Sequence, residues 1–411
     1  MVAVEAIDEL VAGALLGAAG RRVEARHAIR RQAAAAGIWP ASILPFYRAR
    51  AAGTGDRLTV PAINVRGLSY DFIRAVIRAA QARQVGAFIL EIARSEMAYT
   101  DQRPDDLVVI GLASALREGY RGPLFFQGDH YQVKPERGID GEVRTLEQLV
   151  DESMAAGFYN LDVDASTTVD LTQPDPRRQQ AQNVALTARL TSYIRRHQPV
   201  PVNIGGEIGE IGGQVSTVSD LRAFMEAYRA LIPADDGISK VAVQTGTRHG
   251  GRPDAAGRPS AMSVDFAAVA ELTRVARSEF GLAGVVQHGA STLPLDTFDR
   301  FPDAGTAEIH LSTEFQNLIF EHEQFPAELR LGIDQYCFEH FGRERTVGET
   351  DAQFLYRHRK HAWGPFKRQL IDVPAAVRSR IGQSLEDFVA SLFERLRVVE
   401  TRPVVDRLVK R

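Results

Sequence analysis

The chain has 411 residues, 45% of them hydrophobic and 25% charged, which is an ordinary globular composition able to bury a sizeable core. Its formal net charge of -3 supplies no broad basic field for neutralising phosphates, so we expect no nucleic-acid partner. Cys337 is the only cysteine, which excludes an intrachain disulfide and a thiolate metal site. No apolar stretch is long enough to cross a membrane, and the first one follows acidic residues rather than the basic start of a secretory signal. We therefore expect a cytoplasmic protein without a membrane partner.

The chain begins with a predicted helical extension over residues 1–57. Its sequence indicates two helices, and Pro40 and Pro45 mark the break before the main domain.

The main domain, residues 58–322, alternates short β-branched apolar runs with amphipathic stretches of helical period. The runs are TVPAIN (59–64), AFILEIA (87–93), PLFFQGD (123–129), FYNLDVD (158–164), PVNIGGE (201–207), KVAVQTG (240–246), GVVQH (284–288) and AEIHLS (307–312). Eight βα units close a barrel, so we predict a (β/α)₈ TIM barrel, with a doubly wound open sheet as the alternative.

The last part of the chain, residues 323–411, predicts a helical extension rich in aromatic residues and arginines. We expect it to pack against the barrel or form subunit contacts rather than take part in catalysis, in a homodimer or a higher homo-oligomer.

Polar residues gather at the carboxyl ends of the predicted strands. In a parallel barrel these ends meet at one mouth, where enzymes of this fold carry their active sites. The residues in question are Asn64, Asp129, His130, Asp164, Ser166, Glu207, Thr247, His249, His288, His310, Ser312 and Thr313.

Three of these residues, His130, His249 and His288, predict a catalytic metal site. Imidazoles from three different strands can meet at one point above the barrel and leave a position open for substrate. Two of them precede glycine, which lets the backbone approach a ligand closely. For any one of these histidines alone, a structural or surface role is favoured, and it is the three together that favour a metal site.

Carboxylates beside the histidines predict acid/base chemistry. Asp129 can act as a general acid/base, or it can orient His130. Glu207 and Asp164 can contact a metal or brace the histidines.

Small and hydroxyl residues in HGAST (288–292) and HLST (310–313) suit an oxyanion or phosphate, although a plain turn is the competing interpretation. We expect a mobile loop, a candidate lid, at GGEIGEIGG (205–213).

A Schiff-base mechanism through a lysine is less favoured than metal-dependent chemistry. Only five lysines occur; Lys240 starts its strand and is expected to point to the bottom of the barrel, which leaves Lys134 as the one alternative for a Schiff base.

Taken in order, these segments resemble the class II fructose- and tagatose-bisphosphate aldolase family over about residues 58–316. PAINV is similar to the family's P-A-F-N-V, GDH to its D-H pair, and NLDVDAS to M-I-D-G-S. EIGEIGG is similar to E-L-G-x-x-G-G, TGTRHGG to G-T-x-H-G, VVQHGAST to L-H-G-G-S-G, and EIHLST to K-I-N-I-D-T.

The resemblance implies a zinc-dependent lyase of carbohydrate metabolism, such as glycolysis, that reversibly cleaves a phosphorylated ketose through a metal-stabilised enediolate. It implies that His130, His249 and His288 bind the zinc and that Asp129 is the acid/base at the aldol hydroxyl. It also implies that Glu207 and Asp164 contact a second divalent or monovalent cation. We expect the substrate and its phosphate to contact Asn64, Gly250, Gly289, Ala290, Ser291, Ser312 and Thr313.

The chain departs from the family at three places, one of which is the tyrosine and lysine that follow its H-G motif, replaced here by Arg252 and Pro253. The asparagine and aspartate of N-I-D-T are His310 and Ser312 here, so we expect His310 to act beside Asp129 in catalysis. The acidic residues after G-G are replaced by Gln214, Val215 and Ser216. These departures keep a non-catalytic aldolase-like subunit open as an alternative. A metal-dependent hydrolase or isomerase on the same barrel is the other alternative, since a three-histidine site also generates hydroxide.

Overall fold

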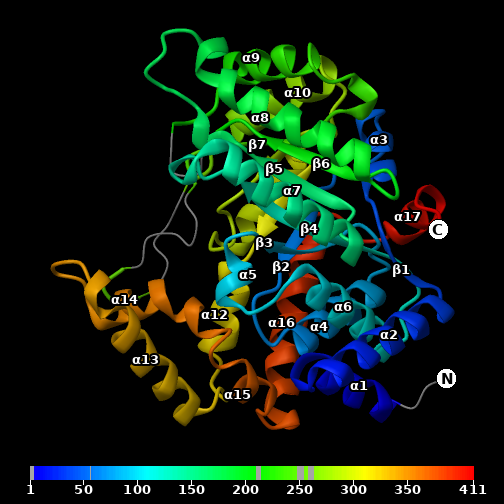
Figure 1. Cartoon of the computed structure of the whole chain (residues 1–411), viewed down its shortest axis with the longest axis vertical. Coiled ribbons are helices and arrows are strands. Elements are labelled where there is room, and N and C mark those ends of the chain that lie inside the picture. The colour runs from blue at the N-terminus through cyan, green and yellow to red at the C-terminus, as the bar shows by residue number, and fades with distance from the viewer. Residues whose placement is uncertain (1–3, 56, 210–213, 248–253, 258–262) are drawn as a thin grey trace.

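Eight parallel strands form a closed barrel in the computed structural model, which describes residues 4–55, 57–209, 214–247, 254–257 and 263–411 (Figure 1). The ring closes because β5 pairs back onto β4. Its strands are β2 (Val60–Asn64), β3 (Ile89–Ala93), β4 (Gly122–Gln132), β5 (Asn160–Asp164), β6 (Asn203–Glu207), β7 (Lys240–Val243), β8 (Val285–Gln287) and β9 (Glu308–Leu311). The predicted TIM barrel is confirmed, and the open doubly wound sheet is excluded.

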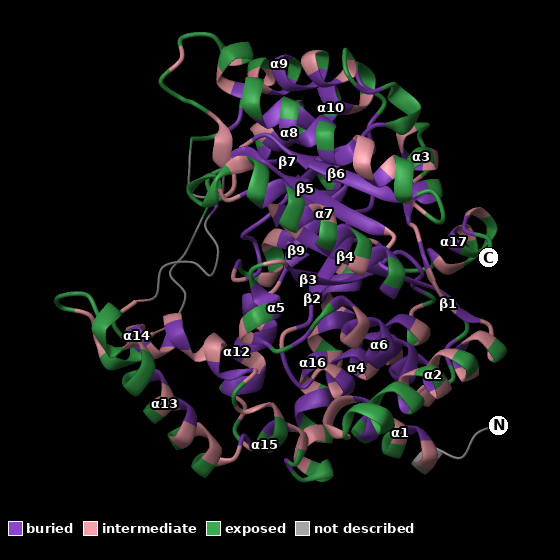
Figure 2. Cartoon of the chain, in the orientation of Figure 1, coloured by how far each residue is buried: buried purple, intermediate pink, exposed green. Residues whose placement is uncertain are grey.

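Each predicted apolar run overlaps one of these strands, and seven of the eight runs contain their strand completely; β4 extends beyond its run at both ends. The barrel strands are buried along nearly their whole length, as Figure 2 shows, because helices cover them outside and side chains fill the interior. A strand buried on both faces carries a continuous apolar run, which is why these strands can be recognised in the sequence.

A β-bulge interrupts β4 at the mouth of the barrel. The register with β5 shifts between Gly128, which pairs with Leu161, and Tyr131, which pairs with Val163. His130, inside this shift, has a positive φ of 42°. Successive side chains of a regular strand point to opposite faces, and a bulge breaks that alternation. Asp129 and His130 can therefore both face the cavity at the mouth, although they are neighbours in the chain.

The outer layer consists of helices that bury one apolar face each. Helix α4 buries Phe72, Val76 and Ala79 while keeping Asp71 and Arg78 in ion pairs on its outer side. The helices that follow the barrel strands are α4 (Ser69–Ala82), α5 (Glu96–Tyr99), α6 (Pro104–Arg117), α7 (Ile139–Ala156), α8 (Pro176–His197), α9 (Val218–Arg229), α10 (Phe266–Ser278), α11 (Arg300–Asp303) and α12 (Thr313–Phe320).

The amino-terminal extension differs from the prediction of two helices followed by a break. It contains α1 (Val4–Leu16), α2 (Ala19–Ala35), a ninth strand β1 (Ile38–Ala41) and α3 (Leu44–Ala51). Pro40 does not end the regular structure; it lies within β1, which pairs in parallel with the first half of β4. This pairing leaves the second half of β4 to β5, and β1 lies on the edge of the barrel, where proline is tolerated.

The carboxy-terminal extension is helical, as predicted. It consists of α13 (Ala327–Phe341), α14 (Asp351–His358), α15 (Lys367–Ile371), α16 (Ala375–Arg395) and α17 (Arg402–Leu408). Helix α16 packs against α4 and α12 on the outside of the barrel, whereas α13 and α14 lie to one side of it (Figure 1). Among the described helices, none has the length and apolar character that a membrane span requires.

Candidate metal and catalytic site

A cavity of about 710 Å³ opens at the carboxyl ends of the strands. Residues from β2, β3, β4 and β9 and from the turn after β8 form its floor, and residues beyond α13 form part of its wall. The predicted site residues on its surface are Asn64, Asp129, His130, His288, Gly289, His310, Ser312 and Thr313. The barrel therefore brings most of the described candidate residues to one cavity.

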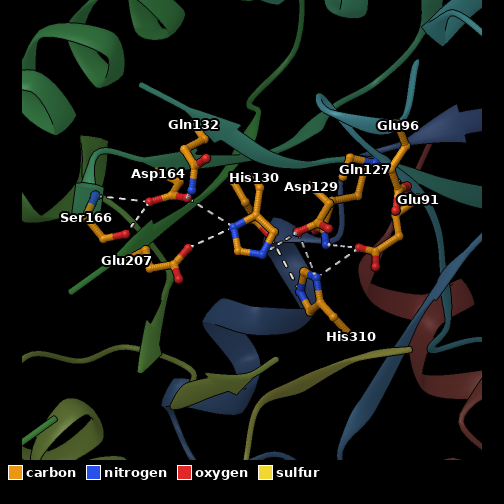
Figure 3. Close-up of polar contacts among 12 residues, drawn as sticks. Glu91, Glu96, Gln127, Asp129, His130, Gln132, Asp164, Ser166, Glu207 and His310 are labelled. Atoms are coloured by element: carbon orange, nitrogen blue, oxygen red, sulfur yellow. Dashed lines mark hydrogen bonds and ion pairs between the residues drawn. The ribbon is translucent and has the colours of Figure 1, made fainter. Parts of the chain in front are cut away.

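His130 is held by two carboxylates from neighbouring strands (Figure 3). Its Nδ1 lies 3.1 Å from Oδ2 of Asp164 and 3.0 Å from Oε2 of Glu207. Asp164 in turn accepts hydrogen bonds from the backbone N–H and hydroxyl of Ser166 and from the side chain of Gln132. A carboxylate on one imidazole nitrogen fixes the ring and leaves the other nitrogen for a metal, as is usual for metal-binding histidines.

The rings of three histidines are adjacent at the mouth. The centroid of His288 lies 4.2 Å from that of His130 and 4.1 Å from that of His310. Two groups of candidate ligand atoms share His288: one contains His130 and Glu207, the other Asp129 and His310, with the atoms of each group within 4.8 Å of one another.

The first of these groups has the chemistry of a divalent-metal site. It offers imidazole nitrogens and a carboxylate oxygen, the donors that zinc and related metals accept. Burial and the nearby charge of Asp164 raise the pKa of Glu207 to about 8. Burial opposes protonation of His130, yet the charges of Asp129 and Glu207 raise the pKa of its ring well above the ordinary value. Both shifts favour the protonated groups, and a divalent cation bound here would replace these protons and favour the ligating forms, the neutral imidazole and the carboxylate.

Asp129 and His310 form a pair on the other side of His288. His310 Nδ1 lies 3.0 Å from Oδ1 of Asp129, and its Nε2 lies 2.7 Å from Oε1 of Glu308. Burial disfavours the protonated ring, but Glu91, Asp129 and Glu308 together raise the pKa of His310 well above its ordinary value. With a carboxylate at each nitrogen, His310 is placed as an imidazolium that orients Asp129.

Below this pair, the interior of the barrel holds a second charged cluster centred on Lys240. Its ammonium group is fully buried, lies 3.0 Å from Asp162, donates to Gln127 at 2.9 Å and forms an ion pair with Glu308. Although burial favours the neutral acid, Lys240 and His310 lower the pKa of Glu308 to about 2. Lys240 is therefore committed to ion pairs and does not face the cavity at the mouth.

The predicted phosphate-binding residues lie near the start of α12. The backbone N–H of Thr313, the first residue of α12, donates to the hydroxyl of Ser291 at 3.2 Å. Ser312, Thr313 and Gly289 line the cavity, whereas Ala290 and Ser291 lie behind that surface. Backbone N–H groups at a helix start suit an anion, so this side of the mouth is compatible with the predicted contact.

Some of the predictions concern residues outside the described part of the chain. His249, Gly250, and the segment 210–213 of the predicted loop 205–213 are among them, and their predicted roles stay predictions.

Several residues of the site were not predicted from the sequence. Glu91 and Glu308 were visible as carboxylates inside apolar runs, a signal of buried charge that could have been followed up. The cavity wall formed by the carboxy-terminal extension had no such signal, because only the folded chain brings it to the barrel. That wall consists of Glu344, Tyr356, Arg357, His358, Lys360 and His361.

A parallel (β/α)₈ barrel with histidines and carboxylates gathered at its mouth is typical of metal-dependent barrel enzymes. The chain belongs to the fructose-bisphosphate aldolase class-II family, whose profile matches residues 49–354. This family generally uses a divalent metal and binds phosphorylated sugars. The comparison with curated proteins finds no match.

Solved structures with the same fold have diverse names. The chain superposes on a probable tagatose 6 phosphate kinase from Sinorhizobium meliloti with a TM-score of 0.60 at 16% identity, covering 84% of this chain and 100% of that one. It superposes on a fructose-bisphosphate aldolase from Campylobacter jejuni with a TM-score of 0.53 at 17% identity, covering 89% and 97%. For fructuronate-tagaturonate epimerase UxaE from Cohnella laeviribosi the TM-score is 0.54 at 13% identity, covering 86% and 82%. At these identities the likeness supports the fold alone.

Proposed function

We propose that the protein is a metal-dependent aldolase that reversibly cleaves a phosphorylated ketose, with zinc as its metal. The observation that carries the proposal is the convergence of His130, Glu207 and His288, whose ligand atoms lie within 4.8 Å of one another at the barrel mouth. Family membership supports the reaction class.

His130 and His288 would hold the metal, together with His249 and with Glu207 as a ligand or brace. Asp164 fixes the ring of His130, and we retain Asp164 and Glu207 as candidates for a second cation. When bound, a divalent metal supplies Lewis-acid polarisation of the ketose carbonyl and compensates the charge that develops during cleavage.

Asp129 is the proposed acid/base. It lines the same cavity as His288, so it can hold the proton of the aldol hydroxyl during cleavage and return it in the reverse direction. His310 orients the Asp129 carboxylate through the 3.0 Å contact at Nδ1. Because His310 is engaged by Glu308 at Nε2, it cannot rotate away without breaking a buried charged hydrogen bond.

The substrate would contact the surface between β2 and α12. Asn64 lines the cavity with a side-chain oxygen that has no hydrogen-bond partner among the described residues, so it is available to a sugar hydroxyl. Gly289, Ser312 and Thr313 would contact a phosphate, with Gly250, Ala290 and Ser291 completing the predicted set.

A second candidate is an isomerase or epimerase on the same barrel. The replacement of the family's asparagine by His310 favours it, because it adds a second ionisable group beside Asp129. The fold is also shared with an enzyme named as a fructuronate-tagaturonate epimerase. A non-catalytic aldolase-like subunit is the third candidate.

The decisive experiment measures metal content and products together. We expect chelator-sensitive conversion of a ketose phosphate into two shorter fragments by the metal-loaded protein. Asp129→Ala should retain the metal and lose roughly 10²- to 10⁴-fold in turnover, the usual contribution of general acid/base catalysis. Products with an intact carbon skeleton would indicate the isomerase. A metal-loaded protein with no turnover of any ketose phosphate would indicate the non-catalytic subunit.

Three further expectations from the sequence stay proposals: the division into segments 1–57, 58–322 and 323–411, a cytoplasmic location, and a homo-oligomer.

A further inference from the structure

The wall of the cavity contributed by the carboxy-terminal extension carries more basic than acidic side chains. Its charged and ionisable members are Glu344, Arg357, His358, Lys360 and His361, and Arg66 and Glu96 face them from the barrel. The family match ends at residue 354, so the basic part of this wall lies beyond the segment that the chain shares with its family. Its function does not follow from family membership.

Most of the positive charge here is already compensated. Arg66 binds Glu96 through Nε at 2.7 Å, and Arg357 binds Glu349 at 2.6 Å and 2.8 Å. Lys360 is different, because no described carboxylate lies within ion-pair distance of its ammonium group. Burial and the charge of Arg66 lower the pKa of Lys360, which is the effect expected of a cation enclosed beside another cation.

Contacts on both sides hold the backbone around Lys360 in place. The preceding residue, Arg359, donates to Asn317 of α12 and to Glu321 directly after that helix, each at 2.6 Å. Further along, the N–H of Gly364 donates to the carbonyl of Tyr99 at 2.8 Å. Lys360 is thus fixed in a short 3₁₀ turn, Arg359–Ala362, that contacts α5.

The next aromatic residue adds to this attachment. Trp363 stacks on Phe320 with ring centroids 4.3 Å apart, and its indole N–H donates to Gln316 at 3.2 Å. A Cβ atom at Gly67 would collide with the Trp363 ring, so the absence of a side chain at Gly67 makes room for the indole. A backbone held this firmly presents the Lys360 side chain from a fixed position, which lowers the cost of ordering the segment when a ligand binds.

We propose that Lys360, assisted by Arg357, binds an anionic group at the end of the substrate remote from the reacting carbons. The group is a phosphate or a carboxylate, because either one supplies a negative charge to balance Lys360 and accepts hydrogen bonds from its ammonium group. The inference rests on the proposed function, because it takes the ligand to be the substrate of that reaction. It deepens that proposal, since the extension then contributes to specificity as well as to packing.

The test compares Lys360→Gln with Lys367→Gln in the metal-loaded, full-length protein. Lys367 belongs to the same extension, donates to the backbone at Asp101, and lines a different cavity. The first measurement is calorimetric titration with inorganic phosphate. We expect Lys360→Gln to weaken phosphate binding roughly 10- to 100-fold, as for a lost charged hydrogen bond, and Lys367→Gln to leave it unchanged. Lys360→Arg should restore most of the affinity.

The second measurement is the KM for three ketoses of equal chain length: a phosphate ester, a uronic acid and a neutral sugar. Lys360→Gln should raise KM for the phosphate or the acid, whichever the enzyme uses, and leave the neutral sugar unaffected. Equal losses in both variants would show that a loosened extension is responsible, and unchanged phosphate binding in Lys360→Gln would also overturn the inference.

The two proposals fail separately. Phosphate binding through Lys360 by a protein that cleaves no sugar would refute the aldolase and leave the anion site standing. Cleavage of ketose phosphates with the same KM in both variants would refute the anion site alone.

Discussion

Two clusters of ionisable residues lie at successive depths in the barrel, and they differ in what balances their charge. The interior cluster contains the carboxylates of Asp162 and Glu308 and already includes a cation, the ammonium group of Lys240. The cluster at the mouth, around His130, has Asp164 and Glu207 within 3.1 Å of the same imidazole nitrogen.

The difference separates a structural cluster from a candidate functional one. Lys240 is completely enclosed, and its partners satisfy it, so the interior cluster needs nothing from solvent. The mouth cluster reaches a cavity of about 710 Å³, and its carboxylates are balanced by a histidine ring instead, whose proton a bound metal ion can replace. A cluster of candidate ligand atoms therefore indicates a metal site only where no lysine side chain already supplies the positive charge. His310 links the two, since its nitrogens contact Asp129 and Glu308.

The largest effect is expected from His288→Ala, which removes the residue shared by both ligand groups at the mouth. Metal affinity and turnover should both fall by more than about 100-fold, beyond the usual loss of a supporting hydrogen bond. Metal analysis by mass spectrometry and a cleavage assay measure the two effects. His340→Ala serves as the control, because His340 is an exposed histidine that does not line the cavity and contacts the backbone carbonyl and the ring of Tyr336. Full metal content in His288→Ala would contradict the assignment of the mouth cluster.

The interior cluster should respond in stability instead. Lys240→Met leaves two buried carboxylates without their cation, which we expect to cost about 3–5 kcal/mol in the free energy of unfolding. Urea denaturation measures this cost. Arg222→Met is the matched control, because its ion pair with Glu279 at 2.7 Å is exposed to solvent and should contribute little to stability. Equal stability changes in the two variants would remove the distinction between the clusters.

A smaller effect is expected from Asp164→Asn, which weakens the brace on His130. Metal affinity should fall about 10- to 100-fold while the fold is retained. Asp170→Asn is the control, because Asp170 binds Thr172 through the same turn geometry with which Asp164 binds Ser166, yet lies in an exposed loop. Competition with a chromophoric chelator gives the affinities, and equal values for Asp164→Asn and wild type would mean that Asp164 does not act on the metal.

The barrel could be predicted because its strands are buried on both faces and end in polar residues. Continuous apolar runs mark such strands directly, and the parallel arrangement brings Asn64, Asp129 and His288 to one mouth. Strand β1 was missed because Pro40 normally argues against a strand, and only its pairing at the edge of β4 makes it acceptable.

The geometry of the site could not be predicted to the same degree. The bulge at His130 depends on one backbone angle that no periodic pattern encodes. The partners of Lys240 come from β5 and β9, and Lys360 reaches the mouth only after the extension has packed on α5 and α12. Contacts between segments so far apart in the chain leave no local signal.

Strand β1 has a consequence for aggregation. It covers the edge of β4 from Gly122 to Phe125, which β5 does not reach. The side chain of Asn160, at the start of β5, connects the three strands. It accepts a hydrogen bond from the backbone N–H of Ile43 and donates to the carbonyls of Ala41 and Phe126. An uncovered edge is a template for another chain. A chain that lacked residues 1–41 would expose this edge of β4, four residues long, to other copies of the protein. Strand β1 therefore protects the protein against edge-to-edge association.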